Sequence, residues 1–183
     1  YHETFNVPVA YEFGFGMSYT DFNVSRFKVK KPNDSLVRIS CTLKNTGPVP
    51  GRQVVQVYIG APNENLDKPG KELKAFKKSK MLMSGEQEKM VFDIKVEDLA
   101  SFYENRSAWV CDKGKYRVEL GFSSKNIKAR KSFNLKDARL VETTNRVLLP
   151  KMSIQDFKAA DSPHKTFKSP KSGFANTKDA VFY

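Results

Sequence analysis

The stretch L-V-R-I-S-C-T-L, residues 36–43, alternates apolar and polar side chains and decides the fold class. A period of two puts every second side chain on one face, which is the pattern of a half-buried β-strand. The sequence N-T-G-P follows at residues 45–48 and supplies turn chemistry. The stretch therefore predicts a strand that ends in a turn, with Cys41 in phase with the apolar residues and pointing into a core.

Similar apolar runs, separated by turn residues, continue on both sides of this strand. The period of two begins at Phe22, and a short helical spacing of one or two turns appears only at residues 97–103. Further strands are expected at residues 53–59, 72–83 (as one strand or two), 90–94, 109–110, 116–120 and 127–135. About seven short strands with turns every eight to twelve residues predict an all-β, antiparallel sandwich rather than βαβ units.

Several large side chains are expected to fill the space between the two sheets. Tyr116, in the sequence G-K-Y-R-V, fits the tyrosine-corner position near the start of the sixth strand of a sandwich. Trp109 is expected in the core, because a single Trp in a sandwich usually packs between the sheets. Leu73, Phe76 and Leu82 are the expected apolar anchors of residues 72–83.

The two cysteines, Cys41 and Cys111, permit one disulfide or two free thiols. In sandwiches whose sheets are bridged, the second Cys lies two residues after the corner Tyr, and Val118 occupies that position here. Free thiols are therefore the favoured interpretation. The two histidines are far apart and no cysteines are paired in sequence, so neither a metal site nor a cofactor is expected.

The chain has 183 residues, a net charge of +12 and a pI near 9.6, which fits one domain with tails. The lysines are spread along the chain, without a run of five basic residues or a nucleic-acid-binding motif, so nucleic acid is not an expected partner. The clusters Lys28, Lys30 and Lys31, and Lys74, Lys77 and Lys78, are expected to form solvated strand faces that guard against edge pairing. No apolar run reaches the roughly 18 residues of a membrane span. The start at Tyr1 suggests a piece of a longer protein.

The sequence E-F-G-F-G-M-S-Y-T-D-F, residues 12–22, precedes the first strand and alternates glycine with large apolar side chains. Glycine at alternate positions suits a backbone that passes close to another surface. Such a segment is either a strap over the chain's own core or a docking surface for a neighbour. The candidate docking residues are Phe13, Gly14, Phe15, Gly16, Met17 and Tyr19.

This segment resembles the P-F-G-Y-G-L-S-Y-T motif of family three glycoside hydrolases, the β-glucosidase and β-xylosidase group. The resemblance continues through N-T-G and G-R-Q-V-V-Q-V-Y in residues 45–58, K-E-L-K-A-F at residues 71–76, S-G-E at residues 84–86 and G-F-S-S at residues 121–124. It covers residues 11 to about 135. It implies an immunoglobulin-like, fibronectin type III-like sandwich at residues 22–137, after a leader at residues 1–21 and before an extended tail or strap at residues 138–183.

The resemblance also implies a role. The family's catalytic domains lie upstream, and the S-D-W motif that carries their nucleophile is absent here, so no catalytic or ligand-binding residue is assigned in this chain. The expected partner is the catalytic part of the same polypeptide, in a secreted or periplasmic retaining β-glucosidase. The alternative is a stand-alone carbohydrate-binding or basic surface-binding module, and weak contact with polysaccharide stays open. N-glycosylation sequons occur at Asn23, Asn33 and Asn105.

Overall fold

The computed structural model describes residues 8–63 and 66–145. The chain divides into two units, residues 12–147 and residues 1–11 together with 148–183, and every strand described below belongs to the first unit. The larger part of the predicted tail, residues 146–183, lies outside the described residues.

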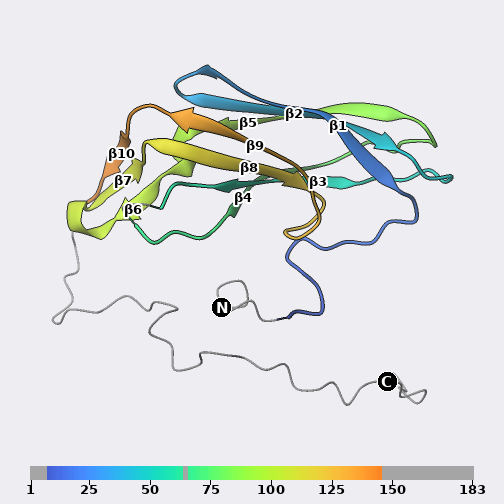
Figure 1. Ribbon diagram of the computed structural model, residues 1–183, viewed down its shortest axis with the longest axis horizontal. Helices are drawn as coiled ribbons and strands as arrows, with labels where there is room; N and C mark the ends of the chain where they lie inside the picture. Colours follow the sequence, from blue (N-terminus) through green and yellow to red (C-terminus); the bar gives the residue numbers. More distant parts are fainter. Residues whose placement is uncertain (1–7, 64–65, 146–183) are drawn as a thin grey trace, which may run out of the picture. The chain divides into compact units, whose positions relative to one another are not determined.

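Two antiparallel sheets face each other (Figure 1). The first has the order β1 (Phe22–Asn33), β2 (Leu36–Asn45), β5 (Gln87–Lys95), and the second has the order β4 (Glu72–Lys78), β3 (Val54–Gly60), β8 (Gly114–Gly121), β9 (Ile127–Leu135). A third, smaller sheet has the order β10 (Arg139–Thr143), β7 (Ala108–Cys111), β6 (Ser101–Tyr103). The 3₁₀ turns η1 (Val96–Leu99) and η2 (Glu104–Arg106) flank β6. The prediction of an all-β sandwich is confirmed.

The core lies between the first two sheets and is built largely by alternate residues of four strands. They are Val37, Ile39, Cys41 and Leu43 of β2, Met90, Phe92 and Ile94 of β5, Val55, Val57 and Ile59 of β3, and Tyr116, Val118 and Leu120 of β8. Each of these side chains is at most 5% exposed. The alternation in residues 36–43 therefore predicted which face of β2 is buried, including the position of Cys41.

The strand count is higher than predicted, and two core assignments are wrong. The described residues contain ten strands, because β6 and β10 extend the short piece expected around Trp109 into a small sheet. Trp109 belongs to that sheet and is 41% exposed, with its ring tilted against Phe102 at a centroid distance of 5.4 Å. Phe76 is exposed as well, because it lies on the edge strand β4 and points away from the core.

The tyrosine corner and the free thiols are confirmed. Tyr116 is fully buried, and its hydroxyl donates to the carbonyl oxygen of Asp112 at 2.9 Å. Its ring stacks on Phe133 with centroids 5.2 Å apart. Cys41 and Cys111 are both free and buried.

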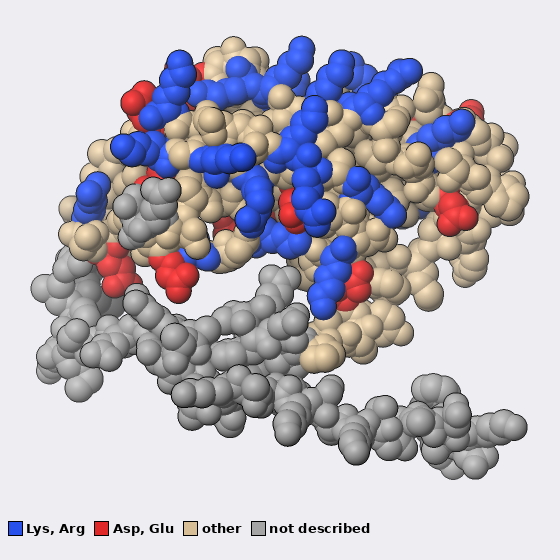
Figure 2. All heavy atoms as spheres, viewed as in Figure 1, with Lys and Arg blue, Asp and Glu red and all other residues tan. Residues whose placement is uncertain are grey.

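Lysines cover the strand edges, as the sequence predicted. Strands β1 and β4 are edge strands of their sheets, and they carry the exposed residues Lys28, Lys30, Lys77 and Lys78. Charged side chains on an edge strand oppose pairing with another chain. Figure 2 shows Lys and Arg side chains spread over the visible face rather than gathered into one patch. Much of the basic charge is thereby explained by protection of the sandwich itself.

Candidate docking surface

The leader segment, residues 12–19, is attached to the sandwich through its backbone. The carbonyl oxygen of Phe13 accepts a hydrogen bond from the Ser124 amide at 2.9 Å, and the carbonyl oxygen of Gly14 accepts one from Gln56 Nε2 at 2.8 Å. The Ser123 hydroxyl adds a bond of 2.6 Å to the Glu12 carboxylate, and this bond lowers the pKa of Glu12. The carbonyl oxygens of Phe13 and Gly14 are thus bound by the sandwich, one by the loop after β8 and one by β3.

Gln56 connects the leader segment to the outer face of that sheet. It lies between core-facing residues of β3, so its side chain points away from the core, yet it is buried. Its Nε2 donates to the carbonyl oxygens of Gly14 and of Phe122, the latter at 2.6 Å, and its Oε1 accepts from the Tyr58 hydroxyl at 2.5 Å. Each polar atom of the side chain therefore has a partner, as burial requires.

Gly14 is the glycine that this contact requires. Its φ is +77°, and a Cβ built there would lie 2.1 Å from Gln56 Oε1. Gly16 differs, because a Cβ at this position would meet no atom within 4 Å. The sequence predicted close backbone approach at both glycines. The structure shows it at Gly14 only, and nothing within the described unit calls for glycine at position 16.

The apolar side chains of the leader segment point into solvent. Phe13, Phe15, Met17 and Tyr19 are 65%, 46%, 90% and 101% exposed. Large apolar residues exposed so close together mark interaction surfaces in soluble proteins. The backbone of the segment is therefore bound to the sandwich while its aromatic side chains are displayed.

At the C-terminal end of the leader segment, Thr20 is buried and fixes the chain where it enters β1. Its hydroxyl donates to Asn45 Oδ1 at 2.8 Å, and the same oxygen accepts from the Gly47 amide at 3.0 Å. Asn45 Nδ2 donates to the carbonyl oxygens of Val49 and Leu82 at 2.8 and 2.9 Å. Asn45 is 0% exposed and uses all four hydrogen-bonding positions of its amide. We call Thr20, Asn45 and these partners the Asn45 hub.

Two glycines make room for Thr20 in the hub. A Cβ on Gly51 would lie 2.5 Å from the Thr20 methyl carbon, and a Cβ on Gly47 would lie 2.3 Å from its hydroxyl oxygen. The sequences S-Y-T and N-T-G-P-V-P-G, which are separate in the chain, are therefore the two halves of one contact.

Charged groups strengthen the second sheet close to the leader segment. Glu119 of β8 accepts from Lys71 Nζ at 3.0 Å and from Arg130 Nε at 2.9 Å. Burial raises the pKa of Glu119, but the hydrogen bonds from Arg130 and Lys71 outweigh burial, so the net shift is downward. Lys71 also lies over the Tyr58 ring, 5.3 Å from its centroid. These contacts help to bury the outer face of β3 and β8.

A second charged cluster holds the loop before β4. Lys68 and Asp112 form a buried ion pair, and the Tyr103 hydroxyl donates to the same carboxylate at 2.6 Å. A buried charge needs such compensation. Lys68 thus ties the K-P-G-K-E-L sequence (residues 68–73) to the loop between β7 and β8, and Lys71 ties it to β8.

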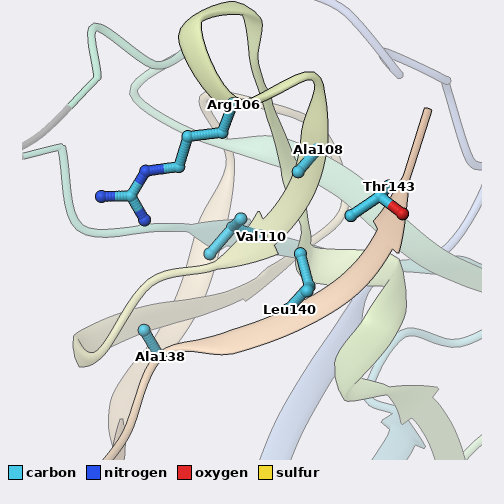
Figure 3. Close-up of a pocket in the computed structure, with 6 residues that line it drawn as sticks. All are labelled: Arg106, Ala108, Val110, Ala138, Leu140 and Thr143. Atoms are coloured by element: carbon cyan, nitrogen blue, oxygen red, sulfur yellow. The ribbon is translucent and has the colours of Figure 1, made fainter. Parts of the chain in front are cut away.

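Two open hollows flank strand β10. The first, about 350 Å³, is lined by Arg106, Ala108, Val110, Ala138, Leu140 and Thr143, without a carboxyl group (Figure 3). The second, about 400 Å³, includes Glu97, Asp98 and Glu142, whose side chains are all exposed.

Metal and membrane sites were also sought within the described ranges. No group of three or more His, Cys, Asp or Glu side chains is placed there to hold a metal ion. Likewise, none of those residues belongs to a helix with the length and apolar character that crossing a bilayer requires. The three sequon asparagines, Asn23, Asn33 and Asn105, are all exposed.

Comparison with known proteins agrees with the fold and with these motifs. Residues 53–124 match the model of the fibronectin type III-like domain. The chain carries a fibronectin type III-like domain. This domain is homologous to the C-terminal region of β-glucosidases of glycoside hydrolase family three, which confirms the resemblance seen in the sequence.

The relatives are much longer than this chain. A β-glucosidase of Ruminococcus albus is 33% identical over 156 residues, which are 82% of this chain and 16% of that protein. A β-glucosidase of Kluyveromyces marxianus is 38% identical over 139 residues, 74% of this chain and 16% of the relative. The structure of β-glucosidase 3B from Thermotoga neapolitana in complex with α-D-glucose superposes with a TM-score of 0.73 at 44% identity, covering 77% of this chain and 19% of that one. The fibronectin type III-like chain thus spans less than a fifth of these proteins.

Sequence reasoning missed the polar residues that hold the leader segment on the fibronectin type III-like domain. Gln56, Ser123, Ser124 and Asn45 lie inside the quoted motifs, but none was assigned a role. A signal was present in the run G-R-Q-V-V-Q-V-Y, where Gln56 and Tyr58 alternate with the core-facing residues and so occupy positions expected to face solvent. Their burial follows from the leader segment and Lys71, which only the folded chain brings to that face.

Proposed function

We propose that this chain is a non-catalytic accessory domain that packs against catalytic domains of the same polypeptide, in a β-glucosidase-like glycoside hydrolase. The observation that carries the proposal is the leader segment, whose backbone is bound by the sandwich and whose apolar side chains are displayed. A strap that served only its own core would point those side chains inward.

The displayed side chains supply a large driving force for association. Full burial of one Phe, Met or Tyr-sized side chain contributes about 1.5–3 kcal/mol. Phe13, Met17 and Tyr19 are each more than half exposed, so most of this free energy is still to be gained. The relatives are more than five times the length of their matching segment, and a neighbouring domain of such a protein offers the surface required.

The acid–base properties of the chain support a non-catalytic role. Hydrolysis with retention needs two carboxyl groups about 5 Å apart, one of which has a raised pKa. Within the described residues, the pKa values of the Glu12, Asp34, Asp93 and Glu119 carboxyl groups are lowered by hydrogen bonds and nearby cations. Lowered values suit charge pairing rather than proton donation to a leaving group.

An activity assay tests this proposal. Residues 1–183 are incubated with nitrophenyl β-glucoside and β-xyloside, beside a family three β-glucosidase as positive control. We expect no release of nitrophenol above the buffer blank. Turnover that persists after repurification and scales with the amount of chain would refute the non-catalytic role.

A second candidate function is contact with polysaccharide. It is favoured by Trp109, whose partly exposed ring lies beside an open hollow and next to Phe102. Retardation of residues 1–183 on insoluble glucan or xylan, abolished by Trp109→Ala and retained by Phe76→Ala, would establish this function. Elution with the void volume would reject it.

We place the polypeptide outside the cytoplasm, as the family resemblance implies.

A further inference from the structure

A second group of exposed apolar side chains surrounds the Asn45 hub. Val49, Met81 and Met83 are 40%, 50% and 55% exposed. Asn45 bonds to the carbonyl oxygen of Val49 itself and to that of Leu82, which lies between the two methionines. Leu82 between the two methionines is fully buried, so alternation turns Met81 and Met83 outward together.

The loops that carry these side chains meet the end of the leader segment at Asn45. One amide group, that of Asn45, bonds to the carbonyl oxygens of Val49 and Leu82 through Nδ2 and receives the Thr20 hydroxyl through Oδ1. Two backbone carbonyls and the Thr20 hydroxyl, from three separate segments, therefore bond to a single side chain. Gly51 and Leu82 add a bridge with bonds of 3.0 and 2.9 Å between the two loops.

We propose that Val49, Met81 and Met83 form, with Tyr19 and Met17, one docking surface around the Asn45 hub, and that its occupant is the neighbouring catalytic domain of the same polypeptide. The inference rests on the proposed function and extends it from the leader segment to two loops of the sandwich. Met and aromatic residues are enriched in the cores of protein interfaces, where charged residues are depleted.

The occupant is chosen from the position of the surface and the size of the relatives. The homologous domain is the C-terminal region of β-glucosidases of which this chain covers 16–19%. The rest of such a polypeptide enters through the leader segment, which ends at the Asn45 hub. The hub surface therefore adjoins the segment through which the rest of such a polypeptide is connected to the sandwich. A second copy of the chain or its own tail would cover the surface without that connection.

Methionine oxidation provides the test, because a thioether is oxidised by peroxide only where solvent reaches it. Met17, Met81 and Met83 are exposed, and Met90 is 0% exposed and serves as the buried reference. Leu140→Met supplies an exposed reference on β10, which Figure 1 shows at the opposite end of the sandwich from the loop that joins β4 to β5. Rates are read by peptide mass spectrometry in residues 1–183 and in the longer polypeptide that joins them to the upstream domains.

We expect Met17, Met81 and Met83 to be oxidised rapidly in residues 1–183, and at least about tenfold more slowly in the longer polypeptide, while Leu140→Met keeps its rate. Protection of Met81 and Met83 without protection of Met17 would contradict a single surface shared with the leader segment, and with it the leader's role in the proposed function.

Five further results would overturn the inference. Protection of Met17 alone would leave the proposed function standing and reject the hub surface. Unchanged rates at all three methionines, or a gene that encodes nothing upstream of Tyr1, would reject both. Slow oxidation of Met81 and Met83 already in residues 1–183 would assign the surface to the tail or a second copy. Equal protection of Leu140→Met would show that the shielding is not confined to this surface.

Discussion

Gly14 and Gly16 are the two glycines of the F-G-F-G repeat, but only at Gly14 do the surrounding atoms exclude a side chain. Alanine at position 14 would have to adopt a φ of +77°, which costs about 1–2 kcal/mol for a residue with a Cβ. It would also collide with the Gln56 amide. Gly14→Ala is therefore expected to release the leader segment without unfolding the sandwich.

The amide of Ser124 reports this release, because it donates to the Phe13 carbonyl oxygen. We expect its hydrogen exchange to accelerate about tenfold or more in Gly14→Ala, which corresponds to roughly 1.4 kcal/mol. Gly16→Ala is the matched control and should exchange like the parent chain. Equal acceleration in both variants would show that the two glycines act alike.

Asn45 is the residue on which the most hydrogen bonds at the hub depend. Asn45→Ala leaves the Val49 and Leu82 carbonyls and the Gly47 amide without this partner, at a cost of about 1–3 kcal/mol for each group that stays unsatisfied. Thr20→Val removes one hydrogen bond and should cost only about 1 kcal/mol. Urea unfolding measures both changes, and similar small losses in the two variants would contradict the central position of Asn45.

At the scale of elements, strand β8 is linked to β9 and to Lys71 through Glu119. The pKa of Glu119 is lowered in the folded state, so its contribution to stability is present above the unfolded pKa and is lost as pH falls through the folded pKa. The stability difference between the parent chain and Glu119→Gln should be largest near neutral pH and shrink in acid. Glu142→Gln, on exposed strand β10, is the control. A difference that grows toward acid pH would contradict the direction of the shift.

The two buried cysteines report on the opening of the sandwich. Burial raises the pKa of Cys41 to about 11, and burial is also the main cause of the rise to about 11 at Cys111. Since the thiolate is the reactive form, both should react with a thiol reagent at pH 8 about a hundredfold more slowly than in urea. Dithiothreitol should leave the unfolding temperature unchanged. Rapid labelling of the native chain would contradict the burial.

The strands were predictable wherever one face is buried and the other is solvated. Residues 36–43 and 90–94 show this alternation, and the structure buries the predicted face of each. Strand β3 was harder to interpret, because the leader segment and Lys71 cover its outer face and bury Gln56 and Tyr58. The role of these polar residues depends on segments far away in sequence. Trp109 was wrongly predicted to lie in the core for a related reason, because no local sequence pattern indicates the third sheet.

At the scale of the whole molecule, the resemblance of ordered motifs carried more information than composition did. The charge of +12 identified no partner, because the lysines are spread along the sequence and the structure spreads Lys and Arg over edge strands and the visible face (Figure 2). The motifs instead converge in space, because S-Y-T meets N-T-G at Asn45 and the aromatic-glycine turn meets Gln56 and G-F-S-S. The docking role of residues 12–19 remains a prediction that needs the longer polypeptide.

Thermal unfolding of a triple variant, Phe13→Ser, Met17→Ser and Tyr19→Ser, tests the docking role most directly. It is measured in residues 1–183 and in the longer polypeptide that carries the catalytic domains. We predict that the isolated chain changes by no more than about 0.5 kcal/mol, as expected for exposed positions, while the longer polypeptide loses several kcal/mol and unfolds at a lower temperature. A large loss of stability in residues 1–183, or an unchanged longer polypeptide, would contradict the proposed docking.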